Sequence, residues 1–346
     1  MLTDKDYCMS SFLMYRRVVN HNIAFYENKV PNTIPERWEK VLINNSEELE
    51  KHLRDRIKDA TSDGKAVLAL SGGIDSAILA KMMPEGSTAY TFKCIAKGKN
   101  VVDETERASK YAKKCRLNHK IVEITWEDMD KYSNILMKHK NAPIHSIEVQ
   151  IYKAALQAKK DGFTKMIFGE TADVNYGGLS NILSKDWTVG DFIERYSYLK
   201  PWCVLRNPKV DFSYFTQFEN NGYIDVHEYL RNFDIIESLN SYKNACETAG
   251  IEFIAPYADT YLNKPLDLSR IRKGENKYII REIFDREYRN FEMPEKIPMP
   301  RPTAEWLKSW EGPKRKEFIK NSVNSLTGDQ KWLVWTLERF LNIMEE

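Results

Sequence analysis

Short apolar runs alternate with amphipathic segments between residues 66 and 168 of the chain. The apolar runs predict four strands, at 66–70, 88–92, 119–124 and 164–168. The segments between them have helical spacing and predict helices at 74–83, 103–116 (with Asp103 as its cap), 128–139 and 146–161. Strands that alternate with helices favour an α/β fold with a doubly wound, mainly parallel sheet.

The two flanks of this region follow other patterns. Residues 1–60 contain no strong strand pattern, and 45–61 predicts an amphipathic helix capped by Asn45 or Ser46. Strands mostly disappear after about residue 180, and helices are predicted at 191–198, 226–249, 276–287, 313–322 and 329–344. We therefore expect three regions: a helical lead-in over 1–60, an α/β core over 61–185, and a helical, substrate-side half over 186–346 packed on that core.

Composition narrows the classes of protein to consider. The 346 residues are 42% hydrophobic, so a large core can form. The 52 basic and 50 acidic residues give a net charge of +2, which makes no electrostatic case for nucleic acid or a membrane as the main partner. The five cysteines show no C-x-x-C spacing and indicate neither a disulfide framework nor a zinc site. The sequence shows no signal-peptide or membrane-spanning pattern, and we expect a cytoplasmic protein.

The first candidate site is the turn that follows the strand at 66–70. Its sequence, Ser71-Gly72-Gly73-Ile74-Asp75-Ser76, leads directly into the helix at 74–83. Such a turn presents backbone N–H groups at the positive end of a helix dipole, where phosphate or pyrophosphate binds. The two glycines let the backbone approach an anion, the serines add hydroxyl donors, and Asp75 offers a carboxylate for Mg²⁺. An ordinary glycine turn without a ligand is the alternative.

The second candidate site follows the strand at 164–168. Here Gly169-Glu170-Thr171-Ala172-Asp173 is followed by Gly177 and Gly178. The carboxyl ends of parallel strands lie at one edge of a sheet, so this loop can face the first. Asp75 and Asp173 could then hold Mg²⁺ against a pyrophosphate. The alternative is a surface loop whose acidic side chains are solvated.

These motifs resemble those of a known group of enzymes. The pattern S-G-G-x-D-S resembles the loop of ATP pyrophosphatases, which include asparagine, NAD and GMP synthetases. The segment 169–178 is similar to the G-E-G-A-D-E-x-x-G-G-Y motif of asparagine synthetases and β-lactam synthetases. Weaker similarities lie at 10–16, 103–112, 256–259 and 277–281. The resemblance implies an adenine nucleotide alpha hydrolase-like fold, ATP and Mg²⁺ as cofactors, and cleavage of ATP between its α and β phosphates.

The resemblance also implies roles for individual residues. The pyrophosphate would be bound by Ser71, Gly72, Gly73, Asp75 and Ser76, and Mg²⁺ by Asp75 and Asp173. Leu70 and the residues after Phe92 would flank the adenine, and the backbone of Gly169 would approach the nucleotide. Glu170 would orient the substrate amine or act as a base, with a plain loop carboxylate as the alternative. Lys296 would neutralise charge at the reacting centre, with Arg301 as the alternative cation.

The chain departs from the asparagine synthetase pattern at several positions. Leu2 stands where that family has the cysteine nucleophile of a glutaminase domain, so we expect no glutamine hydrolysis by this chain. Thr171, Val174 and Leu179 replace a glycine, a glutamate and a tyrosine near the acceptor site. These changes argue against aspartate as the substrate and against assigning a tyrosine–glutamate catalytic pair.

The sequence therefore predicts an ATP-dependent ligase that adenylylates a small-molecule carboxylate and releases pyrophosphate. Ammonia, from solution or from a separate amidotransferase, or an organic amine would then displace AMP. One alternative is an ATP pyrophosphatase of the NAD synthetase type or one that modifies tRNA or a nucleobase. The second motif favours the asparagine synthetase type, and the near-neutral charge argues against tRNA. A further alternative is a nucleotide-binding protein without catalysis.

Overall fold

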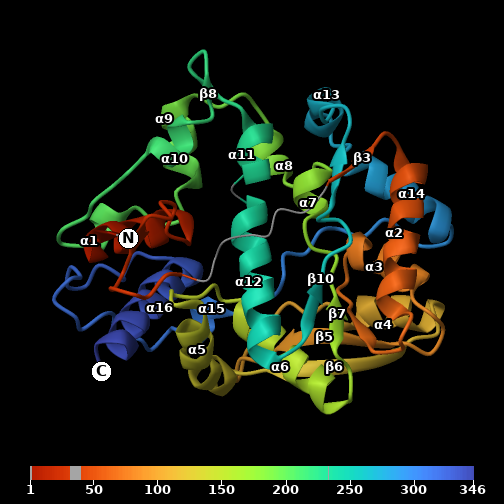
Figure 1. Ribbon diagram of the computed structural model, residues 1–346, viewed down its shortest axis with the longest axis horizontal. Helices are drawn as coiled ribbons and strands as arrows, with labels where there is room; N and C mark the ends of the chain where they lie inside the picture. Colours follow the sequence, from red (N-terminus) through yellow and green to blue (C-terminus); the bar gives the residue numbers. More distant parts are fainter. Residues whose placement is uncertain (1, 32–39, 233) are drawn as a thin grey trace.

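The computed structural model describes residues 2–31, 40–232 and 234–346, and Figure 1 shows how their elements are arranged. The centre is a five-stranded sheet in the order β10-β7-β4-β5-β6. Its strands are β4 (Ala66–Ala69), β5 (Thr88–Cys94), β6 (Asn118–Ile124), β7 (Lys165–Ile167) and β10 (Glu252–Ile254). All neighbouring pairs are parallel, which confirms the predicted doubly wound α/β fold.

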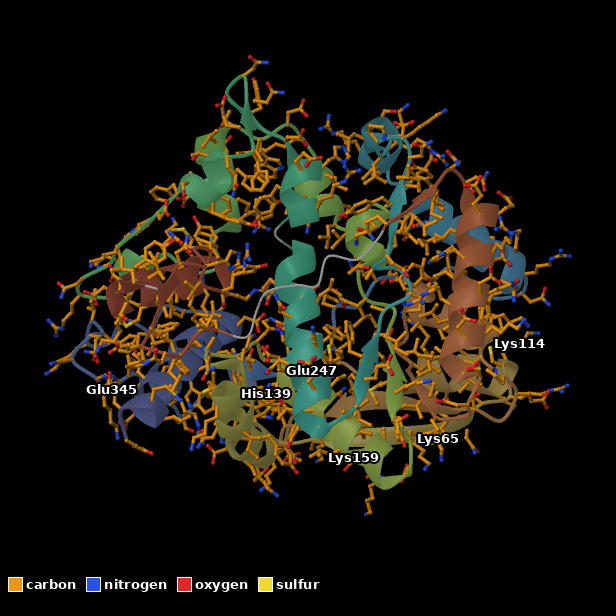
Figure 2. All side chains as sticks on the ribbon, viewed as in Figure 1. Lys65, Lys114, His139, Lys159, Glu247 and Glu345 are labelled. Carbon is orange, nitrogen blue, oxygen red and sulfur yellow. The ribbon has the colours of Figure 1, made fainter. Side chains whose placement is uncertain are left out.

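The strand order reverses at β4. From β4 the chain proceeds through β5 to β6 on one side, and then returns to add β7 and β10 on the other. The carboxyl ends of β4 and β7 therefore flank the switch point of the sheet, where α/β proteins bind their ligands. Figure 2 shows Lys65 and Lys159 at the opposite edge, where β4 and β7 begin.

Apolar side chains on both faces of the sheet hold the core together. Along β4, Val67 packs into one buried cluster while Leu68 packs into the other. The same alternation places Tyr90 and Ala89 of β5 in different clusters. This follows from the period of two in a strand, and a parallel sheet that is covered on both faces needs apolar residues at every position.

Helices from distant parts of the chain cover the two faces (Figure 1). One face is covered by α2 (Ser46–Thr61), α3 (Ile74–Met82), α4 (Thr105–Lys114) and α14 (Tyr278–Glu287). The other is covered by α6 (Glu148–Lys160) and α12 (Asp234–Ala249), with α5 (Trp126–Lys140) packed on both. The same buried cluster extends outward to α16 (Gly328–Glu345), which packs on α5, and to α1 (Lys5–Tyr15), which packs on α16. Elements from the predicted helical half thus complete both layers of the core.

A third buried cluster lies beyond the sheet, where short elements gather. It contains Phe192, Phe215 and Tyr229, whose rings contact one another. The elements here are α7 (Ala172–Asn175), α8 (Ser180–Leu183), α9 (Val189–Tyr196), α10 (Ser213–Thr216), α11 (Val226–Asn232) and α13 (Leu268–Arg272), with the hairpin β8 (Glu219–Asn220) and β9 (Tyr223–Ile224). The 3₁₀ helix Pro201–Cys203 and α15 (Thr303–Trp306) are the remaining helices of the described residues. Among the described residues no helix is both long and apolar enough to cross a membrane.

The structure corrects several predicted elements. Residues 1–60 are not free of strands, since β1 (Leu2–Thr3) pairs with β2 (Ile23–Ala24), and β3 (Val41–Ile43) pairs with β11 (Thr260–Leu262). Of the helix predicted at 226–249, the described residues 226–232 (α11) and 234–249 (α12) are helical, and residue 233 lies outside the described residues. The strand β10 was missed because three residues after a long helix carry too little periodicity.

Two further predictions, at 313–322 and at Asp103, are wrong for local reasons. Residues 313–322 form no helix, because backbone groups in the middle of the segment pair with residues 204–206: Arg206 N–H donates to the Glu317 carbonyl, and Ile319 N–H donates to the Val204 carbonyl, both at 2.9 Å. The N-cap of α4 is Glu104, although the Asp103 carboxylate accepts a hydrogen bond from the Thr105 N–H at 2.7 Å. Asn45 caps α2 as predicted and accepts from the Glu48 N–H at 2.9 Å.

A buried ion pair joins α5 to α6 beneath α12. Lys140 Nζ lies 2.7 Å from Glu148 Oε1, and the two side chains are only 6% and 0% exposed. Asn244 of α12 donates to the other oxygen of Glu148 at 2.7 Å. His139 of α5 also contacts this helix, with its Nδ1 atom 2.8 Å from Asn244 Oδ1. Figure 2 shows His139 close to Glu247, which lies one turn after Asn244 on α12. A carboxylate with this burial depends on its partners.

We predict that Lys140→Ala lowers the free energy of unfolding by about 3 kcal/mol, because it leaves a buried carboxylate without its counter-ion. Denaturant unfolding measures this change. Lys138→Ala, which removes an exposed cation two residues earlier, is the matched control and should have little effect. A Lys140→Ala variant as stable as the wild type would show that the pair contributes nothing.

Candidate active site

A cleft of about 580 Å³ opens at the switch point of the sheet, beyond the carboxyl ends of β4 and β7. Its walls come from the ends of β4, β5 and β7, from α12 and from the residues that begin α14. Residues 293–300 form a further wall, and we call this extended segment the strap. The position is the one that parallel α/β sheets use for ligand binding.

The loop between β4 and α3 is shaped by its own two serines. The Ser76 hydroxyl accepts a hydrogen bond from the Ser71 N–H at 3.0 Å, and the two hydroxyl oxygens lie 2.9 Å apart. Ser71 Oγ also accepts from the Gly73 N–H at 3.1 Å. Gly73 is the N-cap of α3 and makes no side-chain capping bond. The first N–H groups of α3 are therefore available to an anion, as the sequence predicts for this phosphate loop.

The loop after β7 packs tightly against the phosphate loop, and two glycines allow it. A Cβ atom at Gly169 would lie 3.1 Å from the backbone nitrogen of Ser76. A Cβ atom at Gly178 would lie 1.9 Å from Asp173 Oδ1 and 2.2 Å from Lys277 Cε. No side chain fits at Gly178 without moving the charged groups beside it.

Two residues of the site other than glycine adopt left-handed backbone conformations. Thr171 has φ of 70° and Lys277 has φ of 54°. A β-branched residue in this region is strained by about 1–2 kcal/mol, and the resembling motif has glycine at the position of Thr171. Strained residues of this kind gather at functional sites.

A buried lysine joins the two loops. Lys277 Nζ lies 2.5 Å from Asp75 Oδ2 and 2.7 Å from Asp173 Oδ1, and the lysine is only 7% exposed. Lys296 of the strap adds a second ammonium 2.9 Å from the same Asp173 oxygen and donates to the Gly178 carbonyl at 3.1 Å. The two carboxylates that the sequence assigned to Mg²⁺ thus share one buried ammonium.

Burial and charge set the protonation of this network. Burial raises the pKa of Asp75, and Lys277 offsets only part of this effect. Burial acts in the same direction on Asp173, but the two lysines outweigh it and lower the pKa of that carboxyl. Burial alone would lower the pKa of Lys277, yet Asp75 and Asp173 raise it, so the ammonium stays charged.

A third carboxylate, Glu170, lies at the inner end of the cleft against α12. Ser238 donates to Glu170 Oε1 at 2.8 Å, and the Tyr242 hydroxyl also hydrogen bonds to this carboxylate. Burial raises the pKa of Glu170, and these hydrogen bonds act against that rise. The ring of Phe168 contacts Tyr242 with centroids 5.0 Å apart. This end of the cleft combines one acid with an aromatic wall.

The phosphate loop also rests on α4. Glu104 lines the cleft and is 7% exposed. Burial raises its pKa to about 7, although the charge of Arg107 and a hydrogen bond to the Gly72 backbone both act to lower it. A Cβ atom at Gly72 would lie 3.2 Å from Arg107 Cδ and 3.3 Å from Glu104 Cβ. The absence of a side chain at Gly72 therefore lets the phosphate loop pack closely against α4.

The structure brings most of the predicted site residues to one cleft. The lining includes Leu70, Ser71, Gly73, Asp75, Ser76, Phe92, Gly169, Glu170, Asp173 and Lys296. Gly72 lies directly behind, against α4. Of the two candidate cations, Lys296 reaches Asp173, whereas Arg301 pairs with Asp329 of α16 at 3.1 Å. The roles of these residues stay predictions.

Sequence reasoning missed several residues of the cleft. Lys277 was noted only as part of a motif, and no pattern indicated that it would bridge Asp75 and Asp173. Tyr242 and Ser238 lie one turn apart on α12, with the spacing of any helix. Glu104 was noted only within a predicted helix. Its burial beside the phosphate loop depends on tertiary packing that periodicity does not reveal.

Comparison with known proteins adds to this geometry. Solved structures that align with this chain include an NMN synthetase from Francisella tularensis, at 11% identity over 74% of this chain and 99% of that one, with a TM-score of 0.29. An NH₃-dependent NAD synthetase from Campylobacter jejuni aligns at 13% identity over 74% and 100% of the two chains, with a TM-score of 0.27. A tRNA thiolase from Methanococcus maripaludis aligns at 14% identity over 72% and 82%, with a TM-score of 0.29. With scores this low, none of these likenesses bears on function.

The sequence families are more informative. No curated protein matches the chain at a significant level. The asparagine synthase family matches residues 48–325, a span that includes the phosphate loop, the loop after β7, Lys277 and the strap. Because the match covers most of the chain and every part of the cleft, the protein belongs to the asparagine synthase family.

Proposed function

We propose that this protein is an ATP-dependent, AMP-forming carbon–nitrogen ligase that joins a small-molecule carboxylate to ammonia or an amine. The observation that carries the proposal is the meeting of the phosphate loop and the 169–178 loop at one switch point, where Lys277 pairs with an aspartate from each. Membership of the asparagine synthase family supports an ATP-using synthetase. The nitrogen could come from solution, from a separate amidotransferase or from an organic amine.

In the first step an oxygen of the substrate carboxylate attacks the α-phosphorus of ATP. The bond from that phosphorus to the bridging oxygen breaks, and pyrophosphate leaves with the electron pair. The serine hydroxyls and the first N–H groups of α3 would bind the leaving pyrophosphate. The ammonium groups of Lys277 and Lys296 would offset the negative charge that develops there.

In the second step the amine nitrogen attacks the acyl carbon, and the carbon–oxygen bond to AMP breaks. The nitrogen must lose a proton, and Glu170 is the carboxylate at the inner end of the cleft that would accept it. Ser238 and Tyr242 hold this carboxylate in one orientation. Its raised pKa makes Glu170 a stronger base than an exposed glutamate.

The residues present fit a magnesium ion that is bound together with the nucleotide. Asp75 Oδ1 is buried and has no hydrogen-bond partner among the described residues, as a metal-binding oxygen would. No cluster of three or more His, Cys, Asp or Glu side chains forms a cation site within residues 2–31, 40–232 and 234–346. Asp75 and Asp173 would therefore hold Mg²⁺ with phosphate oxygens and water completing its ligands. When bound, the ion supplies positive charge to the phosphates.

The proposal predicts the products of the reaction. Incubation with ATP, Mg²⁺ and a panel of small carboxylic acids and amines should release AMP and pyrophosphate in equal amounts. Chromatography of the nucleotides and an enzyme-coupled pyrophosphate assay measure both products. ADP and inorganic phosphate as products would contradict the proposal, and ATP binding without turnover on the whole panel would favour a nucleotide-binding protein without catalysis.

Asp75→Asn should lower the rate of pyrophosphate release by at least ~100-fold, because the neutral amide loses the charge that faces Lys277 and the metal. Asp55→Asn, an exposed position on α2, is the control and should keep the wild-type rate. Circular dichroism confirms that both variants are folded. A wild-type rate in Asp75→Asn would remove this residue from the site.

Gly178→Ala should lower the same rate by at least ~10-fold, because the added methyl group displaces Asp173 and Lys277. Gly190→Ala provides the comparison, since a Cβ atom there meets nothing within 4 Å. If the Gly178 variant is folded and fully active, the packing of these charged groups does not limit the reaction.

A further inference from the structure

The strap lines the cleft without support from regular structure. Among the described residues, 293–299 make no backbone–backbone hydrogen bond. The carboxyl end of the strap is fixed where the Pro300 carbonyl accepts from Gln150 Nε2 and from the Cys94 thiol, both at 3.1 Å. Its middle carries Lys296, whose ammonium reaches Asp173. The position of Lys296 thus depends on a small number of side-chain contacts.

Arg107 of α4 provides one of these contacts. Its Nη1 atom donates to the Glu295 carbonyl at 2.8 Å, directly before Lys296 in the chain. The same nitrogen lies 3.4 Å from the Gly72 carbonyl of the phosphate loop. The arginine stem packs along Gly72, where a Cβ atom would meet Arg107 Cδ at 3.2 Å. One side chain therefore contacts both the loop that would bind pyrophosphate and the segment that carries the cation.

We propose that Arg107 is a positioning residue that sets the place of Lys296 relative to the phosphate loop. This inference rests on the proposed function, because the reaction requires the cation beside the pyrophosphate. A guanidinium suits the role, because its planar group fixes the direction of its N–H donors, whereas the ammonium of a lysine rotates on a flexible stem. Arg107 acts through Lys296 and has no chemical part in the reaction.

A double-mutant cycle tests this dependence. Arg107→Ala should lower kcat ~10- to 100-fold, with a smaller change in the KM for ATP, because a misplaced group slows the chemical step more than binding. In a Lys296→Ala background the same substitution should cost less than ~2-fold, since the group that it positions is gone. Arg107→Lys should restore part of the loss. Lys110→Ala, an exposed position on the same helix, is the control.

A second measurement does not require the acid and amine to be known. Trypsin can cleave the strap after Lys296, whereas Arg301 is followed by Pro302 and resists cleavage. Loss of the hydrogen bond to Glu295 should raise the cleavage rate after Lys296 by about 5-fold in Arg107→Ala. Mass spectrometry of the early fragments follows this site, and Lys110→Ala should match the wild type.

The outcomes separate the two proposals. A wild-type protein that releases no pyrophosphate on any substrate would contradict the proposed function, while the cleavage rate would still test the role of Arg107. Additive losses in the cycle, or a wild-type cleavage rate after Lys296 in a folded Arg107→Ala variant, would overturn the positioning role.

Discussion

The ammonium group of Lys277, held between Asp75 and Asp173, is the interaction on which the site depends. It joins the phosphate loop after β4, the loop after β7 and the start of α14, which lie far apart in the sequence. The lysine is buried, so its charge is little screened by solvent. Without it, two carboxylates would face each other across the cleft and repel. The helical half of the chain is therefore part of the site and not an addition to it.

This arrangement explains why the strap can serve the same site. The strap follows α14, whose first residue comes directly after Lys277. Fixing Lys277 fixes the start of that helix, and the chain that leaves the helix returns to line the cleft. Lys296 then meets the Asp173 oxygen that Lys277 already contacts. One aspartate oxygen thus contacts two cations from one continuous stretch of chain.

Sequence patterns could predict the fold class and the two loops, because both depend on local signals. Apolar runs mark the strands, and glycines with carboxylates mark the ends of β4 and β7. The rest of the site depends on tertiary contacts. Lys277 lies 202 residues after Asp75 and takes a left-handed conformation that a lysine seldom adopts. Tyr242 occupies an ordinary helical position, and no helix forms at 313–322 because the backbone of Glu317 and Ile319 bonds to Arg206 and Val204.

The prolines of the strap bear on the entropy of the site. Pro294, Pro298 and Pro300 have no backbone N–H, so these positions can border a cavity without burying an unsatisfied donor. Each proline ring also restricts the unfolded chain, which reduces the conformational entropy lost when the segment becomes ordered. The wall of the cleft that has the fewest backbone hydrogen bonds is thus stiffened by its covalent structure. A nucleotide that binds beside such a segment therefore loses less conformational entropy to the ordering of the segment.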